Sequence, residues 1–249
     1  MSPGRILILG GTAEARELAA SLHAEGVAVT SSLAGRVSRP RRPAGAVRVG
    51  GFGGPRALAA WIAEHRVTAV VDATHPFAER ISASAAQACP QAGVPLLRLE
   101  RPGWTERDGD HWHWVADLDA AAAAIPSLGR RVLLTTGRQG LPAFAGVESP
   151  WFLIRCVDPP HPPLPPCHEL LLDRGPYTVD GELALIDQHG LDLVVTKDSG
   201  GGHTAAKLEA ARLRRLPVIV VRRPSRPPSP VPAVVVVDEA LAWARDQAG

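Results

Sequence analysis

Short apolar runs alternate with amphipathic, alanine- and leucine-rich stretches along almost the whole chain. The apolar runs predict strands at 6–9, 27–33, 46–49, 67–71, 94–97, 131–134, 151–154, 168–172, 191–195, 217–221 and 233–237. The amphipathic stretches predict helices at 13–25, 55–65, 77–89, 117–125, 179–188, 204–214 and 238–247. Continuous Val, Ile and Leu strands that alternate with helices are typical of parallel sheets covered on both faces. The pattern therefore predicts an α/β fold.

The number of predicted strands indicates two domains. The eleven apolar runs are more than a single sheet usually holds, so two doubly wound units are the simpler prediction. The step Pro102-Gly103 breaks the rhythm after the fifth strand. We therefore expect an N-terminal domain over 1–100 and a C-terminal domain over 101–249.

Three segments fall outside this rhythm. Residues 109–114 alternate polar and aromatic side chains, which predicts a short edge strand. His111 and His113 share one face of it, but no third ligand is near, so we expect no metal site. The proline-rich stretches 159–166 and 224–230 exclude helix because proline fixes φ. They predict stiff surface connections, with a polyproline ligand for a partner as the alternative.

The first strand runs into a glycine turn, Gly10-Gly11-Thr12, which opens a helix. Unpaired N–H groups and the dipole at a helix N-terminus favour anions, so such a turn can seat the phosphates of a nucleotide. The dinucleotide fingerprint G-x-G-x-x-G would place glycine where Thr12 and Ala15 stand, so only its first position is satisfied. From this turn alone, cofactor binding and a structural turn both stay open.

The loops after the second and third strands carry further candidates, because ligands of open α/β sheets bind beyond the carboxyl ends of strands. Gly35-Arg36 follows the second strand without an acidic residue for a ribose 2′-hydroxyl. Arg36 instead favours a 2′-phosphate, and hence NADP over NAD. Gly51-Phe52-Gly53 belong to a glycine-rich loop in which the backbone can approach a ligand while an aromatic face stays available.

The loop after the fourth strand contains a histidine. Thr74 is predicted to cap a helix that Pro76 opens, which puts His75 at a helix N-terminus. There His75 can contact a cofactor amide or deliver a proton. Asp72 has a structural alternative, which is to bond the backbone of the loop.

Basic and hydroxyl side chains follow the predicted strands of the second half. The candidates for contact with anions are Thr136, Gly137, Arg138, Arg174, Lys197, Ser199 and Gly200. Lys197 is one of only two lysines and precedes three glycines, so an anion explains it better than a weak surface pair with Asp198. The sequence holds no nucleophile elbow, Walker A motif or zinc ligand set. That absence suits hydride transfer, in which a cofactor brings the chemistry.

Composition narrows the class of protein. The net charge of +2 is too small to indicate a nucleic-acid-binding protein. No apolar run approaches the length of a membrane span, and no signal-peptide core is present at the N-terminus. Cys89, Cys156 and Cys167 are odd in number and lack metal-ligand spacing, which favours reduced thiols in the cytoplasm.

Taken together, the loops resemble one known family. The motifs that carry the resemblance are Gly10 to Arg16, Ala34 to Arg36, Gly50 to Gly54, Asp72 to Ala78, Thr136 to Arg138, Arg174 to Pro176 and Thr196 to Gly200. They cover almost the whole chain and are similar to the precorrin-6A reductases of cobalamin biosynthesis. The resemblance implies two Rossmann-like domains with the active site in the cleft between them. It also implies NADPH-dependent reduction of one double bond of precorrin-6A, an anionic tetrapyrrole, to give precorrin-6B.

The resemblance and the loop chemistry together give each candidate a role. The residues expected to bind NADPH are Gly10, Gly11, Thr12, Gly35, Arg36, Gly51, Phe52, Gly53, Thr74 and His75. The residues expected to bind carboxylates of the substrate are Arg138, Arg174, Lys197, Ser199 and Gly200. The candidate proton donors are, in order, His75, Asp198 and Tyr177, with bulk water as a competitor. Transient contact with neighbouring cobalamin-pathway enzymes is a further expectation.

Three alternatives stay open. The cobalt-precorrin-6A reductases of the anaerobic pathway, with NADH as the reported donor, are close relatives of the same family. A two-domain nucleotide-sugar transferase also places its site between Rossmann-like halves. A non-catalytic nucleotide sensor would bind the cofactor without consuming it.

Overall fold

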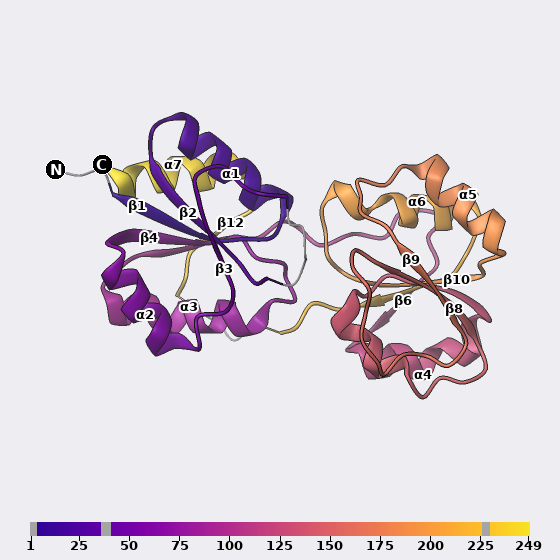
Figure 1. Cartoon of the computed structure of the whole chain (residues 1–249). Coiled ribbons are helices and arrows are strands. Elements are labelled where there is room, and N and C mark those ends of the chain that lie inside the picture. The colour runs from indigo at the N-terminus through magenta and orange to yellow at the C-terminus, as the bar shows by residue number, and fades with distance from the viewer. Residues whose placement is uncertain (1–3, 36–40, 226–229) are drawn as a thin grey trace. The chain divides into compact units, whose positions relative to one another are not determined.

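The chain folds into two compact α/β units in a computed structural model that describes all residues except 1–3, 36–40 and 226–229 (Figure 1). Unit 1 consists of Met1–Pro102 together with Ser225–Gly249, and unit 2 consists of Gly103–Pro224. Each unit has its own parallel six-stranded sheet with helices on both faces. The predicted fold class is therefore confirmed.

The sheet of unit 1 has the order β3-β2-β1-β4-β5-β12. Its strands are β1 (Arg5–Leu9), β2 (Ala28–Leu33), β3 (Ala46–Val49), β4 (Val67–Asp72), β5 (Leu96–Leu99) and β12 (Ala233–Val234). Helices α1 (Ala13–Ala24) and α7 (Val237–Ala248) cover one face, and α2 (Pro55–Glu64) and α3 (Glu79–Ala92) cover the other (Figure 1).

Strand β1 shows why its sequence is apolar at every position. Ile6 and Ile8 pack into the core beneath α1 and α7, whereas Leu7 and Leu9 pack into the core beneath α2 and α3. Successive side chains of a strand point to opposite faces, so a strand between two helical layers needs apolar residues on both. All four side chains are almost completely buried.

The sheet of unit 2 has the order β9-β8-β7-β10-β11-β6. Its strands are β6 (Trp112–Val115), β7 (Arg131–Leu134), β8 (Trp151–Cys156), β9 (His168–Leu172), β10 (Leu193–Lys197) and β11 (Val218–Val221). Its helices are α4 (Leu118–Leu128), α5 (Val179–His189) and α6 (Ala206–Leu213), with short 3-10 helices η1 (Arg138–Phe144) and η2 (Gly202–Thr204). Helices α5 and α6 pack against each other on one face, and α4 lies on the other (Figure 1). The edge strand predicted within 109–114 corresponds to β6, which pairs with β11.

The C-terminal segment corrects the predicted domain boundary. Residues 225–249 belong to unit 1 and not to a domain spanning 101–249. Strand β12 pairs with β5, and α7 buries Ala240 and Ala244 against the core under α1. The chain returns because the edge of β5 and an apolar face of unit 1 would otherwise be exposed, and the C-terminal segment covers both.

Each sheet reverses its strand order once. The reversal lies between β1 and β4 in unit 1, where Leu9 pairs with Asp72, and between β7 and β10 in unit 2, where Leu134 pairs with Val195. Ligands of open α/β sheets bind at the carboxyl ends of the strands that flank such a reversal. Within the part of the chain that the structure describes, no helix has the length and hydropathy needed to cross a membrane.

Candidate functional site

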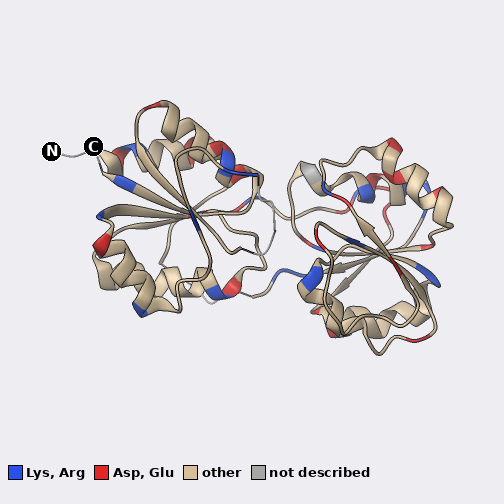
Figure 2. Cartoon of the chain, viewed as in Figure 1, with Lys and Arg blue, Asp and Glu red and all other residues tan. Residues whose placement is uncertain are grey.

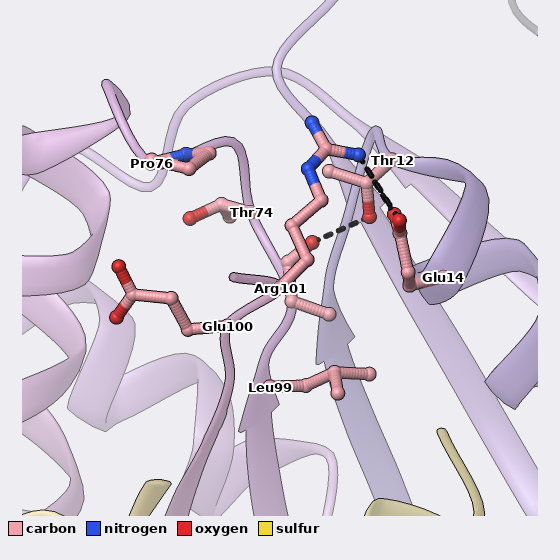
Figure 3. A pocket seen from close by; sticks show the side chains of 8 residues that line it. Thr12, Glu14, Thr74, Pro76, Leu99, Glu100 and Arg101 are labelled. Carbon is pink, nitrogen blue, oxygen red and sulfur yellow. Dashed lines mark hydrogen bonds and ion pairs between the residues drawn. The ribbon is translucent and has the colours of Figure 1, made fainter. Parts of the chain in front are cut away.

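A pocket opens at the carboxyl ends of β1, β4 and β5 in unit 1, beside the reversal of strand order (Figure 3). Its lining residues are Thr12, Glu14, Ala73, Thr74, Pro76, Leu99, Glu100 and Arg101. Leu99 is the last residue of β5, and the others come from the loops that follow these three strands and from the first turn of α1. The sequence-predicted residues Thr12 and Thr74 therefore lie in one pocket.

Thr12 links the two strands at the reversal. It is the N-cap of α1, and its Oγ1 accepts a hydrogen bond from the Ala15 N–H at 3.1 Å. The same hydroxyl donates to the carbonyl of Ala73, which follows β4, at 2.7 Å. A glycine at this fingerprint position could make neither bond, so Thr12 is a different way of building the turn.

Ala15 is accommodated by the glycine that faces it. A Cβ added to Gly10 would lie 3.3 Å from the Ala15 Cβ, which is tighter than ordinary packing. The close approach of helix to strand that the third fingerprint glycine usually provides is therefore provided here by Gly10. Gly11, with φ +117°, completes the turn.

An ion pair lies in the pocket at the first turn of α1. The Arg101 Nη1 donates to both carboxylate oxygens of Glu14, at 3.1 and 3.0 Å, and the two side chains are only partly exposed (Figure 3). Arg101 follows β5, 87 residues along the chain from Glu14. Sequence reasoning did not select Arg101, because nothing local marks it as a partner of α1.

The loop after β4 differs from the prediction at its helix start. Helix α3 begins at Glu79 and its N-cap Ala78 makes no side-chain capping bond, so Thr74 does not cap it. Instead, Asp72 Oδ1 accepts hydrogen bonds from the Thr74 N–H at 3.2 Å and from the Thr74 hydroxyl at 2.7 Å. The Thr74 hydroxyl, which a capping bond would require, is instead hydrogen-bonded to the Asp72 carboxylate. The structural alternative for Asp72 is confirmed.

His75 lies in the turn that precedes α3 and is partly buried. Its Nδ1 accepts from the Phe77 N–H at 3.3 Å. A neutral imidazole with an accepting Nδ1 carries its proton on Nε2. His75 is thereby assigned a tautomer with a donor at Nε2.

Arg48 is a functional candidate that the sequence analysis did not select. It extends from β3, and its guanidinium donates to the Gly50 and Gly51 carbonyls at 2.6 and 2.8 Å and to the Ser32 hydroxyl at 3.1 Å. It also lies 3.6 Å above the Phe52 ring. One face of Phe52 is therefore covered, contrary to the expectation that it stays available. Burial lowers the pKa of Arg48.

Of the other residues predicted to bind the cofactor, three glycines lie in the structure and one arginine is not described by it. Gly35 (φ +71°) follows β2, and Gly51 and Gly53 follow β3 next to it in the sheet. Arg36 lies outside the described residues.

The loop after β7 in unit 2 is built differently from that after β1. Gly137, with φ +77°, precedes the 3-10 helix η1, and no α-helix follows directly. The Arg138 Nη1 donates to the Pro159 carbonyl at 3.2 Å. Thr136 is 5% exposed, and among the described residues its buried Oγ1 has no hydrogen-bond partner. A buried hydroxyl without a protein partner usually makes its hydrogen bond to a ligand or to an ordered water.

The loop after β10 is anchored through its first residue, Asp198. Asp198, which is buried, accepts from the Trp104 N–H at 3.0 Å and pairs with the Arg223 guanidinium at 3.1 Å. Its carboxylate oxygens are thus used as acceptors. Lys197 ends β10 and is partly exposed, and Ser199 and Gly200 follow in the same loop.

Three buried charged residues of unit 2 were missed by sequence reasoning. Arg155 of β8 pairs with Glu182 of α5 at 2.9 Å, and Lys207 of α6 lies in the same region. Tyr177 stacks on the Arg155 guanidinium at 3.9 Å, and its hydroxyl donates to the Asp173 carbonyl at 3.3 Å. Burial, as the largest effect, raises the pKa of the Tyr177 hydroxyl.

Two of the three thiols are poor nucleophiles. Cys89 and Cys156 are buried and Cys167 is exposed, and all three are free. Burial raises the pKa of Cys89 to about 12 and also raises that of Cys156. Thiolates are the reactive form, so these two cysteines are inert.

Charges of both signs are distributed over each unit, and basic and acidic segments lie interspersed (Figure 2). No group of His, Cys, Asp and Glu side chains suited to a metal ion occurs among the described residues. The candidate binding residues of the described chain therefore lie in the loops at the carboxyl ends of the strands, one set of loops in unit 1 and one in unit 2.

Comparison with known proteins decides the family. Residues 5–245 match the family model described as precorrin-6x reductase CbiJ/CobK. The chain belongs to this family. It is 54% identical to a precorrin-6A reductase of Rhodococcus erythropolis, over 96% of each chain. It is 33% identical to a cobalt-precorrin-6A reductase of Salmonella typhimurium, over 90% of this chain and 89% of the relative. A solved structure titled CobK precorrin-6A reductase matches with a TM-score of 0.92 at 41% identity, over 98% of this chain and 97% of that one.

Proposed function

We propose that this member of the family is an NADPH-dependent reductase that saturates one double bond of precorrin-6A to give precorrin-6B. The observation that carries the proposal is the match over almost the full length to relatives named precorrin-6A reductase. The lower identity to the cobalt-precorrin-6A reductases favours the metal-free substrate, with the cobalt form as the second candidate.

The loops of unit 1 fit a dinucleotide. The Gly10–Thr12 turn presents the N-terminus of α1 at a strand reversal, which is where phosphates bind in this class of sheet. Apart from the adjacent residues of the chain, no heavy atom of the described residues lies within 4 Å of the position that a Cβ would take at Gly11 or Gly51. The backbone is therefore open to a close approach. When bound, the nicotinamide supplies the hydride.

The preference for NADPH rests on cations at the ends of β2 and β3. Arg48 stands there beside Ser32, at the place where this strand order puts the adenosine ribose. Arg36 follows β2 in the sequence and is assigned to the 2′-phosphate. Arg36→Ala should weaken NADPH binding much more than NADH binding, as measured by nucleotide fluorescence. Equal losses for both cofactors would remove Arg36 from this role.

The loops of unit 2 supply the groups for a substrate with many carboxylates. Arg138 and Arg174 follow β7 and β9, and Lys197 is the last residue of β10, so the three bring cationic donors to the carboxyl ends of separate strands. Guanidinium groups bind carboxylates in a bidentate geometry, which orients as well as attracts. We assign Ser199 and Gly200 to the same function, through hydroxyl and backbone N–H groups.

His75 is the first candidate for the proton that accompanies hydride addition. Its Nε2 bears the proton in the neutral tautomer, and histidine is the side chain most often used for general acid catalysis. Tyr177 is a weaker acid because burial raises its pKa. Asp198 is already occupied as an acceptor, so we assign it to holding its loop.

The test of the function is stoichiometric consumption of NADPH on addition of precorrin-6A, with the reduced macrocycle identified by mass spectrometry. NADPH binding without consumption would support a nucleotide sensor instead. A response to UDP-sugars and none to NADPH would support a nucleotide-sugar transferase. A higher kcat/KM with cobalt-precorrin-6A would move the assignment to the second candidate.

His75→Ala tests the proton donor. We expect kcat to fall about 10²- to 10⁴-fold, the usual contribution of general acid catalysis, with little change in NADPH affinity. His23→Ala is the matched control, because His23 is an exposed histidine of the same unit. An unaltered kcat in His75→Ala would leave protonation to water.

A further inference from the structure

Lys207, Arg155 and Glu182 form a buried group of charges beneath the loops of unit 2. They come from α6, β8 and the first turn of α5, and their residues are 3%, 7% and 2% exposed. The Arg155 Nη1 lies 2.9 Å from the Glu182 Oε1. Lys207 is close enough for both partners to influence its titration. The group is an arrangement of two cations and one anion in a parallel-sheet core.

The lysine holds one end of the loop after β10. The Lys207 Nζ donates to the Thr204 carbonyl at 2.5 Å and lies 4.7 Å from the centre of the Trp104 ring. The indole N–H of Trp104 donates to the Gly201 carbonyl at 3.1 Å, and its backbone N–H donates to Asp198. Lys207 and Trp104 together therefore hold the loop at its beginning, middle and end.

The arginine supports a second loop, between β9 and α5. The Arg155 guanidinium lies 3.9 Å from the centre of the Tyr177 ring. Tyr177 in turn bonds the Asp173 carbonyl, so the ring closes the loop 173–178 over the buried group. The two loops that contain Arg174 and Ser199 are thus supported from below by one set of charges.

Stability does not explain why charges occupy these positions. Burial of ions is costly, and apolar side chains of similar volume at such positions are often neutral or stabilising. What charged side chains add is direction, because an ammonium aimed at one carbonyl fixes a loop more narrowly than apolar contact does. Buried groups of this kind are therefore expected under loops whose geometry matters.

We propose that Lys207, Arg155 and Glu182, with Trp104, are positioning residues that hold the loops 173–178 and 198–204 ready for the carboxylates of the macrocycle. The inference rests on the proposed function, because it takes these loops as the substrate-binding ones. None of the four residues is required to touch the substrate. Their effect is to reduce the freedom that the loops would lose on binding.

The protonation of Lys207 should modulate this support. The groups that face it are Arg155 from β8, Glu182 from α5 and the Trp104 ring. Burial, and then the charge of Arg155, lower the pKa of the Lys207 ammonium to about 7, whereas Glu182 acts in the opposite direction. Because an ammonium is the stronger donor to the Thr204 carbonyl, the loop should be better ordered below about pH 7 than above it.

The experiment compares Lys207→Met with wild type by hydrogen exchange and steady-state kinetics. Met keeps the length of the side chain and removes its donor. We expect faster amide exchange confined to 198–204, and kcat/KM for precorrin-6A lowered about 10- to 100-fold, mainly through KM. Affinity for NADPH should not change. Arg214→Met is the control, because Arg214 is an exposed cation at the other end of α6.

Trp104→Phe is the second variant, in case Lys207→Met does not fold. It removes the bond to the Gly201 carbonyl and keeps an aromatic ring under the ammonium, so we expect the same exchange pattern with a smaller change in KM. A tryptophan emission change near pH 7 should be present in wild type and absent from Lys207→Met.

The outcomes separate the inference from the proposed function. Unchanged exchange in the loop, or faster exchange with an unchanged KM, overturns the inference while wild type still consumes NADPH. Failure of wild type to reduce the macrocycle overturns the proposed function, whatever the exchange shows. Faster exchange, a raised KM and loss of the emission change together support the positioning role.

Discussion

The two units share a strand order but place different chemistry at the point where it reverses. The sheet of unit 1 follows the order 3-2-1-4-5-6. The sheet of unit 2 follows the same order when its strands are counted from β7 to β11 and β6, the first in the chain, is counted last. In unit 1, β1 leads into the twelve-residue helix α1, which is capped by Thr12. In unit 2, β7 leads into the 3-10 helix η1, whose interior contains Pro142. Only unit 1 has a long helix dipole at this place.

The units also differ in which polar residues they bury. Among the described residues of unit 1, Asp72 is the one buried charged side chain, and the others are threonines and serines. Unit 2 buries Arg155, Glu182, Asp198 and Lys207. A neutral turn with open N–H groups suits a diphosphate, whereas loops supported by buried charges suit a ligand held at several separate carboxylates. This difference fits the proposed division of labour, in which unit 1 binds the cofactor and unit 2 binds the substrate.

The sharpest test of this contrast removes the buried anion of unit 2. Glu182→Gln leaves Arg155 and Lys207 without their counter-charge, so we expect the free energy of unfolding to fall by about 3–5 kcal/mol. Urea-induced unfolding would measure it. Glu209→Gln, which breaks a partly exposed pair with Arg212 on α6, should cost about 0–1 kcal/mol. Similar losses in the two variants would show that the buried group is not what distinguishes unit 2.

A pH series sharpens the same contrast through Lys207. The pKa of Lys207 is lowered to about 7 from its ordinary 10.5, mainly by burial. Between these values the unfolded chain binds more protons than the folded one, so this group makes stability rise with pH there. Thermal unfolding of wild type relative to Lys207→Met should accordingly shift in favour of wild type from pH 6 to pH 9. A difference independent of pH would show that Lys207 keeps its ordinary pKa.

The corresponding test in unit 1 concerns the two hydrogen bonds made by the Thr12 hydroxyl. Thr12→Val removes both the cap and the bond to the Ala73 carbonyl, and should cost about 1–2 kcal/mol in chemical unfolding. Thr178→Val in unit 2 removes a cap alone, from the exposed N-terminus of α5, and should cost less. Equal costs would mean that the bond between the two loops adds nothing.

The smallest expected effect lies at the ion pair of the pocket. Glu14→Gln should change the free energy of unfolding by about 0–1 kcal/mol, because the pair is partly exposed. It also removes a negative charge beside the turn assigned to the diphosphate, so NADPH should bind about two- to fivefold more tightly. Fluorescence titration measures this, with the exposed Glu17→Gln on the same helix as the control. Weaker binding would show that Glu14 contacts the cofactor favourably.

Local sequence patterns specify most helices and strands and the strand-end loops that carry the candidate residues. Strand periodicity is local, so β1 to β5 and β7 to β12 could be read from runs of apolar residues, and the edge strand β6 from its alternation of polar and aromatic residues. The rule that ligands bind at the carboxyl ends of strands then selected the loops at Thr12, Thr74 and Ser199 without any coordinates. Those predictions needed only neighbouring residues.

Tertiary structure decided what depends on residues far apart in the chain. The return of α7 to unit 1 follows from an exposed face that no local pattern records. The bond from Thr12 to Ala73 spans 61 residues, and it turns an apparent mismatch in the fingerprint into a link between two strands. The burial of Lys207 likewise depends on Arg155 and Glu182, more than twenty residues away. A charge can be buried only where the fold brings partners to it, and that condition is not written in the sequence around it.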